Sequence, residues 1–142
     1  MKTYRVAQTI NADANTIWSL LTNSSKYPEW NRSVEKIEGN IALGEKVKVY
    51  GKINPGQAFP VKVIEIIPGE KMVWRGGMPL GLFKGIRTFT LVGEKKGPIE
   101  FCMSERFSGL MSPLIIPSIP DLTPSFERFA MDLKEKAEAA MV

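Results

Sequence analysis

Arg87 and Glu105 are the residues whose types and spacing could do chemistry in this sequence. Alternate residues of a strand share one face, and the faces that carry Arg87 and Glu105 are otherwise apolar, so both charges are expected to point inward. If the turn "GEKKG" closes a hairpin, residue numbers that sum to about 192 face each other, which places Arg87 opposite Glu105. The pair is then a structural ion pair, or it anchors a carboxylate or carbonyl of a ligand. Alternatively, Arg87 reaches past the strand end to water.

The absence of histidine limits the possible reactions. The sequence has no histidine and one cysteine, Cys102. This excludes Ser-His and Cys-His nucleophile pairs and an internal disulfide, and it removes nearly every zinc or non-haem iron site. We therefore expect no metal and no cofactor. A catalytic role falls to Glu105 or Arg87 as weak candidates, since one buried glutamate with a raised pKa would suffice.

Other candidate residues carry less weight. Cys102 falls on the outward face of its strand and is expected to be an ordinary packed cysteine. Glu65 has no second carboxylate at a defined geometry, and Tyr50 could donate a hydrogen bond at the rim of a cavity. The glycines of "GKINPG" and "GGMPLG" do not have phosphate-loop spacing and are interpreted as turns.

Composition predicts a single domain over residues 1–142. The chain has 142 residues, 44% apolar and 24% charged, as is typical of globular proteins. No apolar run is long enough to cross a bilayer, and the start "MKTYRVAQTI" has no signal-peptide core, so we expect a cytoplasmic protein. The net charge of +4 comes from scattered lysines without a nucleic-acid motif, so we expect no nucleic-acid partner.

Hydrophobic periodicity predicts an α+β arrangement. A strand over 2–10 precedes a helix over Ala14–Thr22 that Asp13 can cap. Six strand-like segments with tight turns follow, which favours antiparallel pairing; they are "SVEKIEG", "EKVKVYGKI", "FPVKVIEIIP", "EKMVWRGG", "FKGIRTFTLV" and "GPIEFCMSERFSG". From Pro124 to about Met141 the spacing predicts an amphipathic helix, with Thr123 as N-cap and charged residues on its outer face. Its apolar face must pack on the sheet.

The stretch "KYPEWNRS" places Tyr27 and Trp30 in a connection between a helix and a strand, where polar residues are usual. The aromatic residues are expected either to close over a cavity or to plug one end of the core. Asn31 can hydrogen-bond the backbone and fix the turn into the next strand.

The segment Ser108–Pro124 is apolar and is interrupted by four prolines. Pro117 and Pro120 cannot lie inside an undisturbed helix. The segment is either a lid over a cavity, a fixed connection, or a surface for a second subunit, and exposure of Leu114 with its two following isoleucines would favour association. Both a monomer and a homodimer are compatible with the sequence.

The inward faces of the strands and of the last helix give a predicted ligand-binding set. All its members are expected to point inward, and all except the ion pair are apolar. They are Trp30, Met72, Trp74, Arg87, Phe89, Phe101, Met103, Glu105, Phe107, Phe126 and Phe129.

The order of these segments resembles that of the START-like superfamily, and within it the small bacterial polyketide cyclase/dehydrase-like (SRPBCC) proteins. The resemblance rests on "INADANTIWSLLTNSSKYPEWNRSVEKIEG", "VIEIIPGEKMVWRGG", "GIRTFTLV", "FSGLMSPL" and "FERFAMDLKEKAEAA". It implies a helix-grip (START-like, Bet v 1-like) fold, in which a seven-stranded curved antiparallel sheet wraps around the C-terminal helix, with short helices after the first strand. It also implies a cavity for apolar small molecules. Arg32 stands where the family often has proline.

Three functions remain open at this point. The first is binding of a small apolar, aromatic or amphipathic molecule, as a carrier or sensor. The second is a cyclase or dehydratase that acts on a ligand in the same cavity by shaping it and supplying one acid or base. The third is a co-chaperone-like interaction domain. The missing histidine and carboxylate pair favour binding over catalysis.

Overall fold

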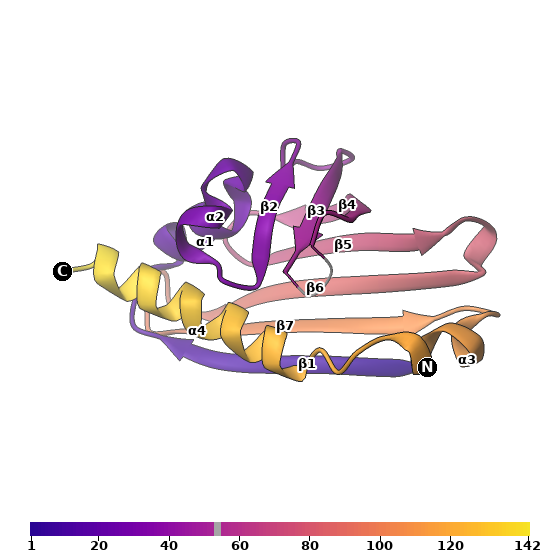
Figure 1. The fold of residues 1–142 in the computed structure, drawn as a ribbon. Coiled ribbons are helices and arrows are strands. Elements are labelled where there is room, and N and C mark those ends of the chain that lie inside the picture. Colours follow the sequence, from indigo (N-terminus) through magenta and orange to yellow (C-terminus); the bar gives the residue numbers. More distant parts are fainter. Residues whose placement is uncertain (53–54) are drawn as a thin grey trace.

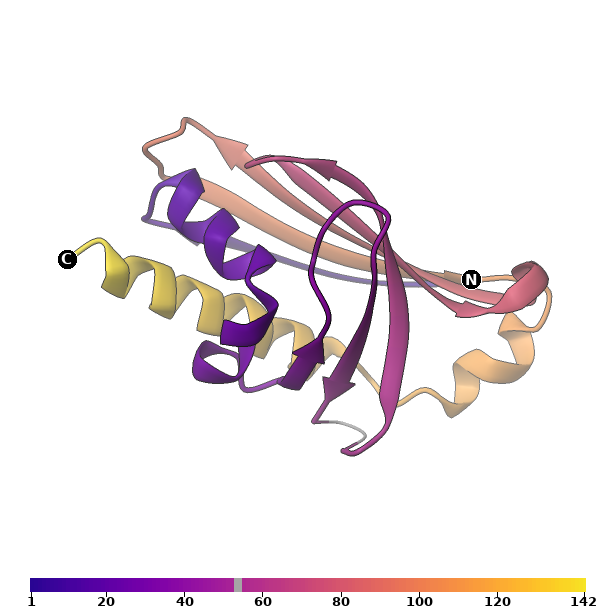
Figure 2. The ribbon, with the colours of Figure 1, turned by 90° about the horizontal axis from the view of Figure 1, so that it is seen from above.

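The computed structural model describes residues 1–52 and 55–142. Seven strands form one antiparallel sheet in the order β1-β7-β6-β5-β4-β3-β2, so the first strand lies at an edge beside the last. The sheet is curved, and the C-terminal helix lies along its concave side (Figures 1 and 2). The strands are β1 (Lys2–Ile10), β2 (Val34–Glu38), β3 (Lys46–Gly51), β4 (Ala58–Ile67), β5 (Lys71–Met78), β6 (Phe83–Gly93) and β7 (Ile99–Ser108).

The predicted strands are confirmed, with two changes at their ends. The strand predicted over 45–53 ends at Gly51. Ile53 and Asn54, which belong to the stretch "GKINPG" that was interpreted as a turn, lie outside the described residues. Gly76 and Gly77, which were also assigned to a turn, belong to β5. The turn "GEKKG" closes the β6–β7 hairpin in the predicted register, with Arg87 opposite Glu105.

Short helices follow β1. In α1 (Ala14–Thr22) the predicted cap is confirmed, because Asp13 Oδ1 accepts a hydrogen bond of 2.7 Å from the Thr16 N–H. The aromatic stretch is not a loop: Tyr27–Trp30 forms one helical turn, α2, with Pro28 in its first turn, where the fixed φ of proline suits a helix. Asn31 has its predicted role, since its Oδ1 accepts a hydrogen bond from the Ser33 N–H at 2.9 Å.

The C-terminal helix α4 (Thr123–Ala140) begins one residue before the predicted start. Leu122 stands at the N-cap without a side-chain hydrogen bond, so Thr123 is not the cap. The Thr123 N–H donates instead to Asp121 Oδ1 at 3.0 Å, because the turn before the helix brings that carboxylate to the first free N–H.

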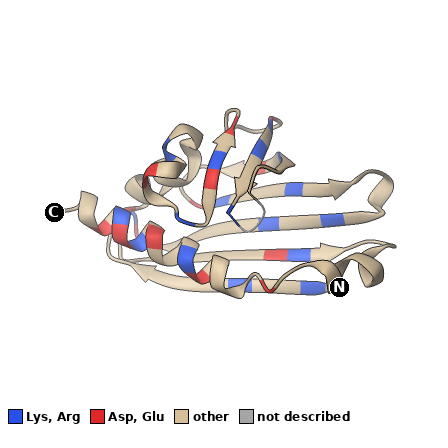
Figure 3. Ribbon diagram, viewed as in Figure 1, with Lys and Arg blue, Asp and Glu red and all other residues tan. Residues whose placement is uncertain are grey.

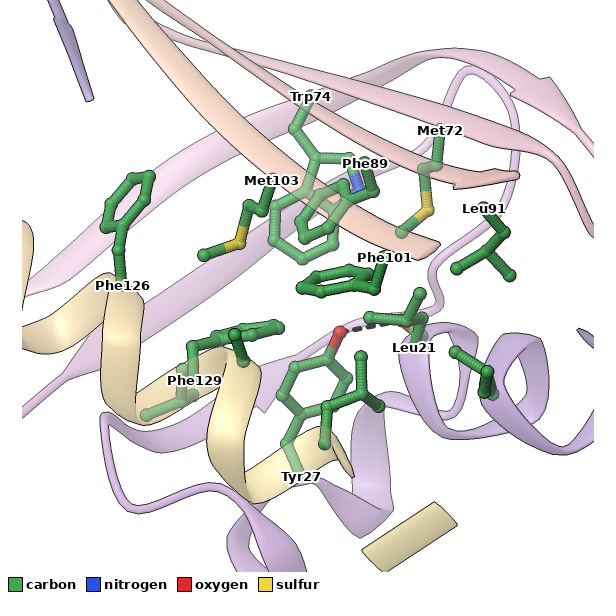
Figure 4. Close-up of a cluster of buried hydrophobic side chains, with 14 of the residues drawn as sticks. Leu21, Tyr27, Met72, Trp74, Phe89, Leu91, Phe101, Met103, Phe126 and Phe129 are labelled. Carbon is green, nitrogen blue, oxygen red and sulfur yellow. Dashed lines mark hydrogen bonds between the residues drawn. The ribbon is translucent and has the colours of Figure 1, made fainter. Parts of the chain in front are cut away.

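Apolar side chains fill the half of the concave side that lies toward α1 and α2. Phe129 of α4 is at the centre of this packing, with its ring centroid 5.6–6.2 Å from four other aromatic rings. Figure 4 shows the cluster between the sheet and the helices. Its fully buried members include Ile10, Ile17, Leu21, Tyr27, Met72, Phe89, Phe101 and Leu133.

An ion pair fixes α4 against the end of α2. Asp132 was expected on the charged outer face of the helix, but its side chain is only 4% exposed, against 65% for Arg32. Its carboxylate accepts hydrogen bonds from the Arg32 backbone N–H at 2.7 Å and from Nε at 2.9 Å. The side-chain hydrogen bond to Asp132, together with the negative charge of that carboxylate, raises the pKa of Arg32. Proline at this position would lack the backbone donor, so an arginine here supplies a contact that proline could not make.

Phe129→Ala is expected to lower the free energy of unfolding by about 3–5 kcal/mol, because four aromatic rings lose a common neighbour. Urea denaturation measures this change. The control is Arg128→Ala at the exposed neighbouring position, for which we expect a change of less than about 0.5 kcal/mol. A loss of less than about 1 kcal/mol for Phe129→Ala would contradict the described packing.

Asp132→Ala is expected to cost about 2–3 kcal/mol, because it leaves the Arg32 N–H without its acceptor. Arg32→Ala should cost less than about 1 kcal/mol, since the backbone N–H remains and the lost guanidinium is largely exposed. The same urea experiment compares the two variants. Equal losses would mean that the guanidinium, rather than the backbone donor, carries the contact.

Candidate functional site

The other half of the concave side is hollow. A cavity of about 680 Å³ lies there, within the size range of ligand pockets. Its wall comes from the middle strands, from the first turns of α4 and from the segment that leads into α4. Most of this wall is apolar. The lining residues with polar side chains are Ser33, Gln57, Arg87, Glu105, Ser118 and Ser125, besides the indole of Trp74.

Two glycines form part of the cavity floor. Gly76 of β5 pairs with Gly85 of β6, which pairs with Phe107 of β7. A Cβ built on Gly85 would stand 3.0 Å from Phe107 Cε1, and one on Gly76 would stand 3.0 Å from Val61 Cγ1. These neighbours therefore lie directly against the glycine backbone, which a larger residue would prevent. The two glycines themselves add no side-chain bulk to the cavity.

Aromatic rings form the wall around this floor. The rings of Phe83 and Phe107 stack with centroids 5.7 Å apart, and Trp74 packs edge-to-face on Phe89 at 4.8 Å. Phe126 reaches the cavity from α4, and Figure 4 shows it on the side of Met103 away from the packed cluster. Such a wall suits a flat or branched apolar ligand.

The Arg87–Glu105 pair lies on this wall. Arg87 Nε donates a hydrogen bond of 2.9 Å to Glu105 Oε1, and the two side chains are 20% and 16% exposed. The guanidinium carbon of Arg87 also stands 4.9 Å from the centre of the Phe126 ring, a cation–π contact. The predicted ion pair is thereby confirmed, and its mutual contact holds both side chains in place.

This pairing leaves hydrogen-bonding groups unused. Within residues 1–52 and 55–142, neither Nη of Arg87 has a hydrogen-bond partner, and neither has Glu105 Oε2. The buried indole N–H of Trp74 is likewise without a partner among these residues. A ligand in the cavity can therefore meet guanidinium donors and a carboxylate acceptor at one place on an otherwise apolar wall.

The predicted ligand-binding set divides between the cavity and the packed core. Trp74, Arg87, Met103, Glu105, Phe107, Phe126 and Phe129 line the cavity. Trp30, Met72, Phe89 and Phe101 do not; they are buried in the packed half, where the rings of Tyr27, Trp30 and Phe129 contact one another. The strand residues among them all point inward as the alternation predicts, but a strand's inward face runs through both halves, so alternation cannot separate the two groups. Tyr27 and Trp30 thus plug the core and do not cover the cavity.

Several lining residues were missed by the sequence analysis. Gly76 was interpreted as a turn residue and Gly85 was not considered, although glycines inside strand patterns often mark a close approach of a ligand or of another chain segment. Phe83 and Val61 also line the cavity. The alternation used for the strand of Phe83 would have included that residue, and the strand of Val61 was not treated in this way.

The proline-rich segment forms one wall of the cavity. α3 (Ser112–Ile115) and a 3₁₀ turn over Ile116–Ser118 replace a continuous helix, as the prolines predict. Ile115, Ile119 and Leu122 line the cavity from this segment. Leu114 is exposed, whereas the two isoleucines after it are half-buried.

The weaker candidates lie outside the cavity. Tyr50 was expected at the rim but donates a hydrogen bond of 2.7 Å to Glu38, a contact that raises its pKa. Glu65 pairs with Lys71 at 3.4 Å. Burial raises the pKa of Tyr27 well above its usual value, and its hydroxyl donates to the Leu21 carbonyl, so it is not an acid or base near neutral pH.

Among the described residues, no cluster of three metal-binding side chains is found, and no helix is long and apolar enough to span a membrane.

No protein-family model matches this chain, and no curated protein matches it in sequence. Solved structures match it over nearly its full length. A protein from Mesorhizobium loti is 15% identical with a TM-score of 0.73, covering 97% of this chain and 98% of that one. Zhui aromatase/cyclase from a Streptomyces species is 10% identical with a TM-score of 0.74, covering 99% and 96%. Norcoclaurine synthase from Thalictrum flavum, in complex with a transition-state analogue, is 17% identical with a TM-score of 0.72, covering 99% and 96%.

The chain has the helix-grip fold, which it shares with these solved structures. The predicted fold class, an α+β helix-grip sheet of seven strands, is thereby confirmed. At identities of 10% and 17% the likeness establishes the fold alone, because one fold supports many activities. The function of this chain must therefore be inferred from the residues that line its cavity.

Arg87→Met and Glu105→Met are each expected to cost about 2–3 kcal/mol, because each leaves a largely buried charge unmatched. The double variant should recover much of this loss. Urea unfolding of the four proteins gives the coupling energy. The exposed pair Glu65 and Lys71 is the matched control and should couple by less than about 1 kcal/mol. An equally small coupling energy between Arg87 and Glu105 would contradict an ion pair that is held between the sheet and α4.

Proposed function

We propose that this protein binds a small, mostly apolar molecule in the cavity between the sheet and α4. The ligand carries one hydrogen-bond-accepting oxygen, a carbonyl or a carboxylate, which the free Nη groups of Arg87 receive. The protein acts as a carrier or sensor for this ligand. The ion pair with its unused donors, on an otherwise apolar wall, carries the proposal.

The energetics of the site support this assignment. The Nη groups of Arg87 have no acceptor among the described residues, so a ligand oxygen can add a charge-assisted hydrogen bond as it binds. Glu105 and the Phe126 ring hold the guanidinium in position, so little side-chain entropy is lost when the ligand arrives. The apolar wall supplies affinity, and the ion pair supplies orientation.

A second candidate is catalysis of a cyclisation or dehydration in the same cavity, and Glu105 favours it. Its Oε2 has no partner among the described residues and can take or give a proton. One of the similar solved structures is an aromatase/cyclase. Turnover of a poly-β-keto substrate that is lost in Glu105→Gln, with binding of that substrate retained, would establish this activity.

The binding proposal is tested with two neutral probes of similar shape, acetylnaphthalene and ethylnaphthalene, which differ in one carbonyl. We expect the ketone to bind about tenfold more tightly, the value of one hydrogen bond to a charged donor. Quenching of tryptophan fluorescence, with Trp74 in the cavity wall, and thermal melts report the affinities. In Arg87→Met combined with Glu105→Met, the preference for the ketone should vanish. Absence of binding by both probes would overturn the proposal.

A cavity-filling variant localises the binding. Val61 lines the cavity on β4, whereas Ile64 on the same strand does not and is exposed. Val61→Phe should weaken binding of both probes at least tenfold, because the added ring occupies the cavity. Ile64→Phe should leave binding unchanged. Equal affinities in the two variants would show that the probes bind elsewhere.

A further inference from the structure

Leucine side chains project into water at one end of the molecule. Leu80 is 92% exposed, Leu110 is 84% exposed and Leu114 is 77% exposed. Leu80 lies in the turn between β5 and β6, and the other two lie after β7 and in α3. We call these three residues, with the half-exposed Met78, the leucine tip. Exposed apolar residues that gather at one place mark an interaction site more often than single ones do.

Hydrogen bonds hold the two segments of the leucine tip together. The Met111 N–H donates to the Leu82 carbonyl at 2.7 Å, which ties the segment after β7 to the β5–β6 turn. Met78 pairs with Phe83 at the base of that turn. The leucines therefore project from a connected framework and share one end of the molecule, where Figure 1 places the β5–β6 turn and α3.

The backbone at Leu80 is strained. Its φ is +63°, and among the described residues it is the one non-glycine residue with a positive φ. This left-handed conformation is unfavourable for a residue with a Cβ, and Gly81 beside it has a positive φ as well. With 92% of Leu80 exposed, its side chain gains little inside the folded chain to offset the strain. Strain kept without an internal gain points to a function outside the chain.

Cationic side chains lie on the strands behind the leucine tip. Lys84 lies near the start of β6, Arg106 near the end of β7, and Lys2 pairs with Phe107 on the adjacent edge strand; all three cations are exposed. In Figure 3 the β5–β6 turn and α3 carry neither blue nor red, while blue bands lie behind them on β6, β7 and β1. The carboxylate of Asp121 lies near Lys2, and its pKa is lowered by the Thr123 N–H and by Lys2.

We propose that the leucine tip docks on the surface of an anionic lipid bilayer. The leucines enter the interfacial region, and Lys2, Lys84 and Arg106 approach the phosphate headgroups. A second copy of this chain fits less well, because a symmetric contact at the tip would bring the cations of both copies together. Separate projecting leucines also suit a fluid interface better than a flat protein surface.

Docking in this orientation brings the cavity close to the membrane. Phe83 and Ile115 line the cavity and follow leucine-tip segments in the chain. An apolar ligand can then pass between lipid and cavity with a short path through water. This consequence rests on the proposed ligand-binding function, whereas the docking itself does not.

Flotation with lipid vesicles, in the absence of any cavity ligand, tests the docking. The wild-type protein should bind vesicles of phosphatidylcholine mixed with phosphatidylglycerol and bind vesicles of phosphatidylcholine alone at least tenfold more weakly. Salt raised to about 0.5 M should weaken binding to the mixed vesicles, because it screens the headgroup charge. Equal binding to both kinds of vesicle, or no binding to either, overturns the proposal.

Leu80→Gly separates docking from folding. Glycine accepts the positive φ, so this variant should melt at an equal or higher temperature than the wild type, yet bind the mixed vesicles about tenfold more weakly. Leu110→Ala should weaken binding to a similar extent. The matched control is Leu43→Ala, at an exposed leucine of the β2–β3 connection, which should bind as the wild type does.

Two results with these variants would overturn the docking proposal. One is a loss of vesicle binding in Leu43→Ala as large as that in Leu80→Gly. The other is a dimer of the wild type in sedimentation that dissociates in Leu110→Ala, which would assign the leucine tip to a second copy of the chain. In either case probe binding in the cavity remains a separate measurement.

Discussion

The position of Phe129 between a filled half and a hollow half of the grip is the constraint on which the structure depends. Its ring contacts the aromatic cluster beneath α1 and α2, and its residue also lines the cavity. A helix inside a curved sheet can fill the whole concavity only if every inward row carries large side chains. Here the rows toward α1 do so, whereas the row from Val61 to Phe107 has no side chain at two neighbouring positions, Gly76 and Gly85. The cavity is thus set by the distribution of side-chain volume along the strands.

The filled half provides the rigidity that a preorganised site needs. Asp132 ties α4 to Arg32, so the helix that carries Phe126 is fixed relative to the sheet that carries Arg87. Phe126 in turn lies against the Arg87 guanidinium, whose Nε is held by Glu105. The polar group of the cavity is therefore positioned from both walls, and a ligand need not reorganise it on binding.

The sequence predicted the fold, the hairpin register and the ion pair, because period-two alternation and short turns constrain antiparallel strands strongly. It did not predict which inward residues face a ligand. Met72 and Phe89 have the same parity and chemistry as Trp74 and Phe107, and their burial depends on what packs above them, which is a tertiary property. Asp132 was assigned to the outer face of α4 because a buried carboxylate is recognised only through its partner, here one hundred residues away in the chain. Of the two glycines of the cavity floor, Gly76 was interpreted as a turn residue and Gly85 was not considered, although their place inside strand patterns was a usable signal.

A crystal structure of the protein with acetylnaphthalene bound tests the central claim most directly. The account predicts the naphthalene rings between Trp74 and Phe126, the carbonyl oxygen at hydrogen-bonding distance from an Arg87 Nη, and the Arg87–Glu105 contact unchanged. The packed cluster around Phe129 should also be unchanged, because the ligand enters space that is already open. A structure in which the probe lies outside the cavity, or in which it displaces the cluster around Phe129, would contradict the claim that one half of the grip is a preformed ligand site.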